Sequence, residues 1–322
     1  MLNSIAKAID VVDWRAQYDK CVKRLLSQKI ILAWILKECV DEFKPFTIEQ
    51  IMCDCIEGEI SVSVRAVDQD ELDYDENLAS QVDGRDTEDS SIKEGTVYYD
   101  IRFNAVVPDT DEPVQLIINV EAQKDNKLPY PLIKRAIYYL ARMISAQKNT
   151  VFTKSHYEKI RKVYSIWIQM NVDDDEKNTI SAYRFTEDNI VGSSKESKEN
   201  YDLMTAIMLR LGNVTDEVEQ PILRLLDVLL SAEKRPEEKK EVLEHDFNIP
   251  MSDSISKEVN DMCNLGQGLV EMTELRTTAN IVMRMMKKKH VSLEEALDYV
   301  DVSDDERESV IRFIDKELAV MS

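Results

Sequence analysis

Two acidic residues, Asp100 and Glu121, lie in strand-like segments on either side of a short turn. Residues 97–107 and 114–123 are rich in Val, Ile, Tyr and Phe, which favour strands, and the turn between them has a proline at each end. If the hairpin is symmetric about this turn, Asp100 lies directly opposite Glu121, with the two Cβ atoms about 5 Å apart. Like charges so placed destabilise a sheet, and a divalent cation such as Mg²⁺ between them would turn the repulsion into attraction.

The same register divides the hairpin into two faces, because side chains alternate along a strand. The predicted polar face carries Tyr98, Asp100, Arg102, Asn104, Asn119, Glu121 and Gln123, and the other face carries Tyr99, Ile101, Phe103, Ala105, Ile118, Val120 and Ala122. A second explanation stays open here: antiparallel sheets often have one wet face, on which both carboxylates would simply be solvated. A slip of one residue in the register would place the carboxylates on opposite faces and remove the metal site.

The composition restricts the class of protein. The chain has 322 residues, enough for two domains, and its hydrophobic fraction of 43% is ordinary for a globular protein. It shows no signal-peptide pattern and no apolar run long enough to span a bilayer, so we expect a cytoplasmic protein that does not bind membranes. Five cysteines argue against a disulfide framework, and three histidines leave little material for a zinc site.

Charge is distributed unevenly along the chain. The net charge of −21 argues against nonspecific binding of nucleic acid by the whole surface. Residues 68–94 contain eleven acidic and two basic residues, whereas residues 124–162 contain ten basic and two acidic ones. The protein can therefore carry one basic face, although lysines and arginines on helices are usually plain solvated surface.

Hydrophobic periodicity predicts the elements that surround the hairpin. We expect helices at residues 18–43 and 48–55, a loop at residues 65–95, a helix between residues 129 and 147, and strands at residues 162–170 and 178–186. This order of helices and strands predicts an α/β (α+β) core with a central mixed sheet flanked by helices.

The chain after residue 195 has helical spacing throughout. Helices are expected at residues 201–211, 221–232, 236–247, 253–265, 270–289, 293–299 and 304–321. We therefore predict a core of residues 1–195 and an all-helical C-terminal region of residues 196–322. The last two helices resemble a small helix-turn-helix, but acidic residues at its turn would repel phosphate, so a helical hairpin for packing or self-association is favoured.

Several short stretches carry a resemblance to a known family. They are residues 18–26 (YDKCVKRLL), 87–92 (TEDSSI), 99–103 (YDIRF), 117–123 (IINVEAQ), 130–139 (YPLIKRAIYY), 142–147 (RMISAQ) and 262–265 (MCNL). Together they resemble the recombination-promoting nuclease branch of the PD-(D/E)XK nuclease family transposases. The resemblance implies a restriction-endonuclease-like core and metal-dependent endonucleolytic cleavage of DNA.

The resemblance also implies roles for the paired acids. Asp100 and Glu121 would bind Mg²⁺ or Mn²⁺, helped by the backbone carbonyl of Ala122. Gln123 stands where the wider superfamily has a lysine, and a neutral amide cannot supply that lysine's positive charge. This branch is known for glutamine at the position, so the departure does not by itself imply an inactive enzyme.

Other residues would complete such a site. Lys134, which we favour, or Arg135 would supply the missing positive charge from the following helix, and Glu38 or Glu42 is a further acidic ligand suggested by position alone. The basic stretch would contact DNA phosphates. The candidate contacts are Lys124, Arg135, Arg142, Lys148 and Lys154.

Two functions remain open from the sequence. The first is a metal-dependent DNA endonuclease of transposase or recombination-promoting type. The second is a nuclease-fold protein with weakened catalysis that acts as a DNA- or protein-binding module, which the neutral Gln123 and the negative net charge favour. In either case the helical C-terminal region would support a homo-oligomer.

Overall fold

The computed structural model describes residues 11–62, 88–91, 95–108, 114–123, 128–212, 219–231 and 234–321. The α-helices are α1 (Val11–Leu26), α2 (Lys29–Cys39), α3 (Ile48–Gln50), α4 (Leu132–Ser145), α5 (Lys198–Tyr201), α6 (Pro221–Leu230), α7 (Pro236–Phe247), α8 (Asp253–Lys289), α9 (Leu293–Tyr299) and α10 (Asp304–Met321). The shorter turns are the 3₁₀ segments η2 (Asp41–Phe43) and η4 (Tyr157–Lys159) and the π-helical η3 (Ile51–Cys55). The strands are β1 (Ile56–Val62), β2 (Glu88–Ser91), β3 (Gly95–Tyr98), β4 (Ile101–Val107), β5 (Val114–Gln123), β6 (Val163–Gln169), β7 (Thr179–Arg184) and β8 (Met204–Arg210).

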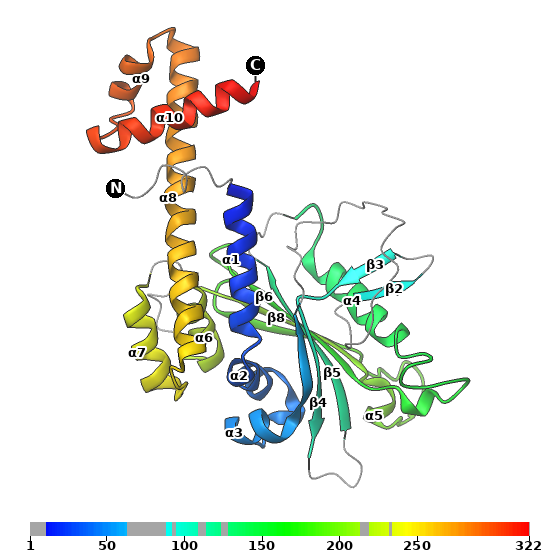
Figure 1. Ribbon diagram of the computed structural model, residues 1–322. Coiled ribbons are helices and arrows are strands. Elements are labelled where there is room, and N and C mark those ends of the chain that lie inside the picture. The colour runs from blue at the N-terminus through cyan, green and yellow to red at the C-terminus, as the bar shows by residue number, and fades with distance from the viewer. Residues whose placement is uncertain are drawn as a thin grey trace. The chain divides into compact units, whose positions relative to one another are not determined.

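A mixed sheet forms the centre of the fold, in the strand order β1-β4-β5-β6-β8-β7 (Figure 1). β1, β4 and β5 are antiparallel neighbours, β5, β6 and β8 run parallel, and β7 pairs antiparallel with β8. β2 and β3 make a separate antiparallel pair. The predicted core, a central mixed sheet flanked by helices and followed by a helical C-terminal region, is confirmed.

The hairpin of β4 and β5 has the predicted register. Ile101 pairs with Val120 and Arg102 with Asn119, so that Asp100 comes opposite Glu121. The turn of the hairpin lies mostly outside the described residues. The register on the far side of β5 is parallel and sets Glu121 beside Trp167 of β6.

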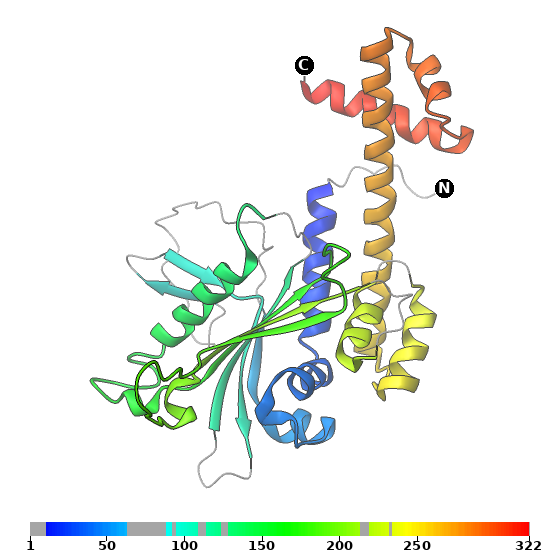
Figure 2. The ribbon, with the colours of Figure 1, turned by 180° about the vertical axis from the view of Figure 1, so that it is seen from behind.

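Helix α4 covers the face of the sheet on which Trp167 lies, while α2 and α6 lie on the other side (Figures 1 and 2). The cluster under α4 joins Tyr139 and Met143 of the helix to Trp167 and Met208 of the sheet. Tyr99 belongs to this cluster too and packs edge-on against Tyr139, with ring centroids 5.3 Å apart. The prediction that Tyr99 faces away from Glu121 was wrong, because strand alternation is interrupted at residues 99 and 100, between β3 and β4.

The single helix predicted at residues 18–43 is two helices. α1 ends at Leu26, and Gln28 adopts an extended backbone conformation before α2 begins. The Ser27 hydroxyl donates to the Arg24 carbonyl at 2.8 Å, which satisfies one of the last acceptors of α1. The break lets α1 end and α2 start in a new direction without a proline.

Three strands, β1, β2 and β8, were missed from the sequence. β8 was predicted as part of a helix at residues 201–211, but Thr205 to Leu209 are buried on both faces and have no polar alternation. A buried strand of this kind cannot be told from a helix by periodicity. β1 was not predicted as a strand at all. The predicted loop at residues 65–95 lies mostly outside the described residues, and its described parts belong to β2 and β3.

The chain divides into two compact units. One contains residues 19–261 with the sheet, and the other contains residues 1–18 and 262–322. In the second unit α9 and α10 pack with the end of α8 around a core that includes Val282, Leu297 and Ile314. The division at residue 195 stays a prediction, although the sheet itself continues past that position through β8. None of the described helices has the length and hydropathy of a membrane span.

We predict that Trp167→Ala lowers the free energy of unfolding by about 3–5 kcal/mol, because it empties the centre of the cluster that fixes α4 to the sheet. Trp167 is fully buried, and its ring centroid lies 5.4 Å from that of Tyr139. Urea denaturation followed by circular dichroism measures the change. Tyr183→Ala, at a 42% exposed position of β7, is the control and should change stability little. Equal losses in the two variants would contradict the assignment of this cluster as the core of the fold.

Candidate functional site

Asp100 and Glu121 meet where the backbone pairing of β4 and β5 ends. The backbone pairing stops at Ile101 and Val120. At the next pair, carboxylate oxygens of the side chains accept hydrogen bonds in place of backbone carbonyls. The backbone N–H of Asp100 donates to Glu121 Oε1 at 2.9 Å, and the N–H of Ala122 donates to Asp100 Oδ2 at 3.1 Å. Each carboxylate is therefore held by the strand of the other, and the two acids converge.

Both carboxylates are buried, with 1% of each residue exposed. The alternative of a wet face on which they are simply solvated is therefore wrong. Burial, and then the negative charge of Asp100, raise the pKa of Glu121 well above its ordinary value, while the Asp100 N–H and the charges of Arg135 and Lys23 oppose the shift. Burying two like charges side by side costs free energy, and positive charge nearby lowers that cost.

A lysine of α1 supplies one positive charge directly. Lys23 Nζ lies 2.9 Å from Asp100 Oδ1 and 2.8 Å from Asp19 Oδ2, one helical turn earlier. The Lys23 side chain is only 1% exposed. Burial lowers the pKa of Lys23, but the charges of Asp100 and Asp19 together outweigh it and raise the pKa above its ordinary value.

An arginine of α4 approaches from the other side. Arg135 donates to Tyr139 Oη from Nε at 3.2 Å and from Nη2 at 2.9 Å, and its guanidinium lies over the rings of Tyr139 and Trp167. Burial lowers the pKa of Arg135, but Tyr139 and then Glu121 raise it by more. Arg135 is thus a fixed cation that acts on Glu121 across the aromatic cluster.

The acids fit a hard divalent cation. Mg²⁺ is commonly held by one or two carboxylates, while waters and substrate phosphates fill the remaining positions. Glu121 Oε2 is buried and has no hydrogen-bond partner among the described residues, which leaves it available as a ligand. The described residues hold no group of three or more His, Cys, Asp or Glu that could bind a metal ion together, so this site offers a pair of acids.

The basic residues predicted to act at the site or on DNA differ in how exposed their side chains are. Lys134, Lys148 and Lys154 have exposed side chains, as residues that contact DNA would require. Arg142 is 3% exposed and donates to Tyr138 Oη at 3.4 Å, so its prediction as a free surface contact was wrong. The charge of Arg135 lowers the pKa of Glu121, whereas Lys134 is exposed, and which of the two supplies the missing positive charge stays a prediction.

Two predicted side chains near the acids lie outside the described part of the chain. Gln123 ends β5, but its side chain is not described, and Lys124 is not described at all. Their roles stay predictions.

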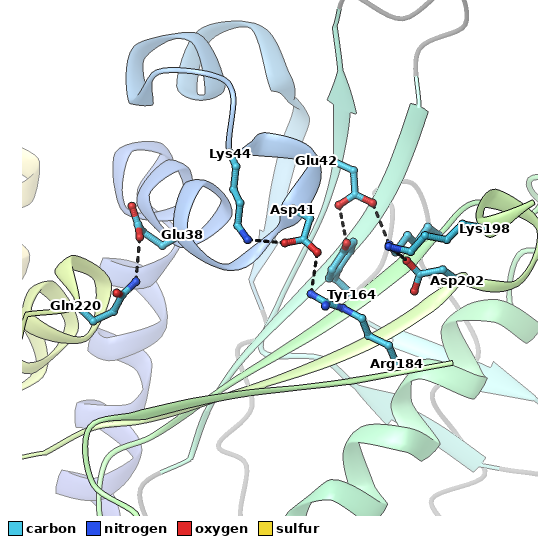
Figure 3. Close-up of polar contacts among 10 residues, drawn as sticks. Glu38, Asp41, Glu42, Lys44, Tyr164, Arg184, Lys198, Asp202 and Gln220 are labelled. Carbon is cyan, nitrogen blue, oxygen red and sulfur yellow. Dashed lines mark hydrogen bonds and ion pairs between the residues drawn. The ribbon is translucent and has the colours of Figure 1, made fainter. Parts of the chain in front are cut away.

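The further acidic ligands suggested from position, Glu38 and Glu42, have other partners. Glu38 accepts from Gln220 at 3.1 Å. Glu42 accepts from Tyr164 at 2.5 Å (Figure 3). It also accepts from Lys162 at 3.0 Å, and Lys162 contacts Asp202 as well. This ion-pair network joins η2 to the start of β6, whereas Glu121 aligns with Trp167 near the end of that strand. The expectation that either acid completes the site was wrong.

Lys23 and Asp19 were not predicted as site residues. Both lie in one of the stretches that carried the family resemblance, at the four-residue spacing of an ion pair on a helix. Lys23 stands among Val22, Leu25 and Leu26, which are all buried. A lysine inside an apolar helix segment is the signal that pointed to a buried partner.

Comparison with known proteins gives one finding for function. The family model described as PD-(D/E)XK nuclease family transposase matches residues 89–262, more than half of the chain, and this range includes both acids. No curated protein and no solved structure matches the chain.

We predict that Glu121→Gln stabilises the metal-free protein at pH 8. Since the folded pKa of Glu121 is raised, the folded state binds its proton more tightly than the unfolded state, and stability falls as pH rises from the unfolded value through the folded one. Glutamine keeps an acceptor for the Asp100 N–H and removes the charge. The midpoint of urea unfolding in EDTA should therefore be higher for the variant at pH 8.

The difference between variant and parent should shrink as the pH approaches 4.5, where Glu121 is protonated in the folded parent. Glu57→Gln, at an exposed position of β1, is the control and should show no such trend. A variant less stable than the parent at pH 8 would show that Glu121 is not strained by its surroundings.

Proposed function

Since the chain belongs to the PD-(D/E)XK nuclease family transposases, we propose that it is a metal-dependent endonuclease that hydrolyses phosphodiester bonds of DNA. The observation that carries the proposal is the convergence of Asp100 and Glu121, which are buried and hold each other through backbone hydrogen bonds. Nucleases of this superfamily generally use divalent metal ions, and we propose Mg²⁺ or Mn²⁺.

Asp100 and Glu121 would bind the cation, together with the backbone carbonyl of Ala122. When bound, the cation would polarise the scissile phosphate and lower the pKa of an attacking water. Because the Ala122 N–H holds Asp100 and the Asp100 N–H holds Glu121, the carboxylates need little rearrangement to bind it. Gln123 follows on the same strand, where its amide would orient the attacking water or the phosphate by hydrogen bonding.

Basic residues at the surface would bind the DNA backbone and hold it near the two acids. We propose that Lys134, Lys148 and Lys154, whose side chains are exposed, contact phosphates, and that Lys124 does so as well. Arg135 would act from within the site, through Glu121. Such contacts carry no base sequence information by themselves, so we expect cleavage with little sequence preference and a strong dependence on salt.

One observation favours a second function. The ammonium of Lys23 already neutralises Asp100 without any metal ion. A nuclease fold stabilised in this way, with glutamine at the motif position, would serve as a DNA- or protein-binding module with weak catalysis. Cleavage by the parent protein and its loss in the variants below decide between the two functions.

Two broader features belong to the same proposal. The unit that contains α9 and α10 would mediate a homo-oligomer and so position two sites on one DNA molecule. We place this activity in the cytoplasm. Light scattering of the full chain measures its oligomeric state directly.

We predict that Glu121→Gln and Asp100→Asn each lower the rate of plasmid nicking in Mg²⁺ at least about 100-fold, because each removes one negative ligand while it preserves size. The conversion of supercoiled to open-circular plasmid on an agarose gel measures the rate. Calorimetric titration with Mn²⁺ measures cation binding in the same variants, which should be weakened in both.

Glu57→Gln is the matched control, because it makes the same change at an exposed position of the sheet and should nick like the parent. A parent protein that binds DNA and does not nick it in Mg²⁺ or Mn²⁺ would favour the binding module. Variants that nick at the parent's rate would show that a contaminating nuclease, or another site, performs the cleavage.

A further inference from the structure

We propose that Lys23 of α1 is the positively charged group of this active site and takes the place that Gln123 leaves without charge. The inference rests on the proposed endonuclease and goes beyond it, since Lys23 lies outside the matched residues 89–262 and 100 positions before Gln123.

The geometry of Lys23 is that of a fixed group and not of a surface lysine. Its ammonium lies between Asp100 Oδ1 at 2.9 Å and Asp19 Oδ2 at 2.8 Å. The side chain is 1% exposed, while that of Asp19 is 24% exposed. Asp19 therefore anchors the lysine at the rim of the site, and Lys23 extends inward to Asp100, which directly precedes β4.

A balance of charges explains why the site needs this lysine. Asp100, Glu121 and a bound phosphodiester each carry one negative charge, and a divalent cation supplies two positive ones. Lys23 supplies the remaining positive charge, while Asp19 and Arg135 offset each other. Without Lys23 the loaded site would hold an uncompensated negative charge in a buried place, where charge interactions are strong.

Lys23 and Arg135 have separate tasks. Arg135 is tied to Tyr139 by two hydrogen bonds and lies over the Trp167 ring, so it acts on Glu121 from the α4 side. Lys23 contacts a carboxylate oxygen directly and approaches from α1. It positions Asp100, the first acid of the motif, through an ion pair of 2.9 Å.

The test compares Lys23→Met, Lys23→Arg and the control Lys20→Met, which changes an exposed lysine of the same helix. Two quantities are measured: plasmid nicking at saturating Mg²⁺, and binding of Mn²⁺ by calorimetry without DNA. Lys23→Met should nick about 100-fold more slowly and bind Mn²⁺ about tenfold more tightly, because a positive charge beside the ligands is gone. Lys23→Arg should nick within about tenfold of the parent, and Lys20→Met should match the parent in both measurements.

Nicking by Lys23→Met at the parent's rate would overturn the proposal. So would a joint loss of nicking and of Mn²⁺ binding that arginine does not rescue, since this would mark Lys23 as a support of the fold alone. If the parent binds Mn²⁺ and does not nick DNA, the endonuclease proposal fails by itself, and tighter Mn²⁺ binding by Lys23→Met than by Lys20→Met still decides for the lysine. If Lys23→Met does not fold, Lys23→Gln keeps a donor for Asp100 without the charge and takes its place with the same expectations.

Discussion

The structure depends on the exchange of hydrogen bonds between two carboxylates and two backbone N–H groups at the end of a strand pair. A ladder that simply ended there would leave buried N–H groups of Asp100 and Ala122 without acceptors, which is costly. The carboxylates accept from these groups and are themselves fixed by them. The cost of burying two like charges is met by hydrogen bonds and by nearby cations, so the same contacts that end the strand pair also build the site.

This arrangement links elements that are far apart in the chain. Lys23 connects α1 to the start of β4, and Arg135 connects α4 to β6 through Tyr139 and Trp167, the residue that pairs with Glu121 of β5. The two cations approach the acids from different elements, and neither is placed by the hairpin itself. The geometry of the site therefore depends on the sheet together with its helices. The hairpin alone would leave two acids that repel each other exposed to solvent.

The sequence predicted the hairpin well and its surroundings less well. Strand composition and a proline-bounded turn were enough to pair Asp100 with Glu121, because register follows from local symmetry. Burial did not follow, since the same polar pattern fits a wet face. β8 was missed because a strand buried on both faces loses its alternation, and Arg142 was misplaced because a basic residue on a helix usually faces solvent. Lys23 was missed because its place in an apolar helix segment indicates a buried partner but does not identify Asp100, which lies far away in the sequence.

The neutral side chain of Gln123 does not determine whether a positive charge reaches the two acids. Coulomb interactions depend on distance and surroundings and not on which element supplies the charge. What matters is that a cation reaches the acids from a buried and anchored position, and Lys23 meets both conditions through Asp19 and α1. A surface lysine such as Lys134 does not, because solvent screens an exposed charge and its side chain must lose rotamer freedom to reach inward. The positive charge that a lysine at the motif position ordinarily supplies can therefore come from another element. In this chain it comes from Lys23 of α1 and not from β5.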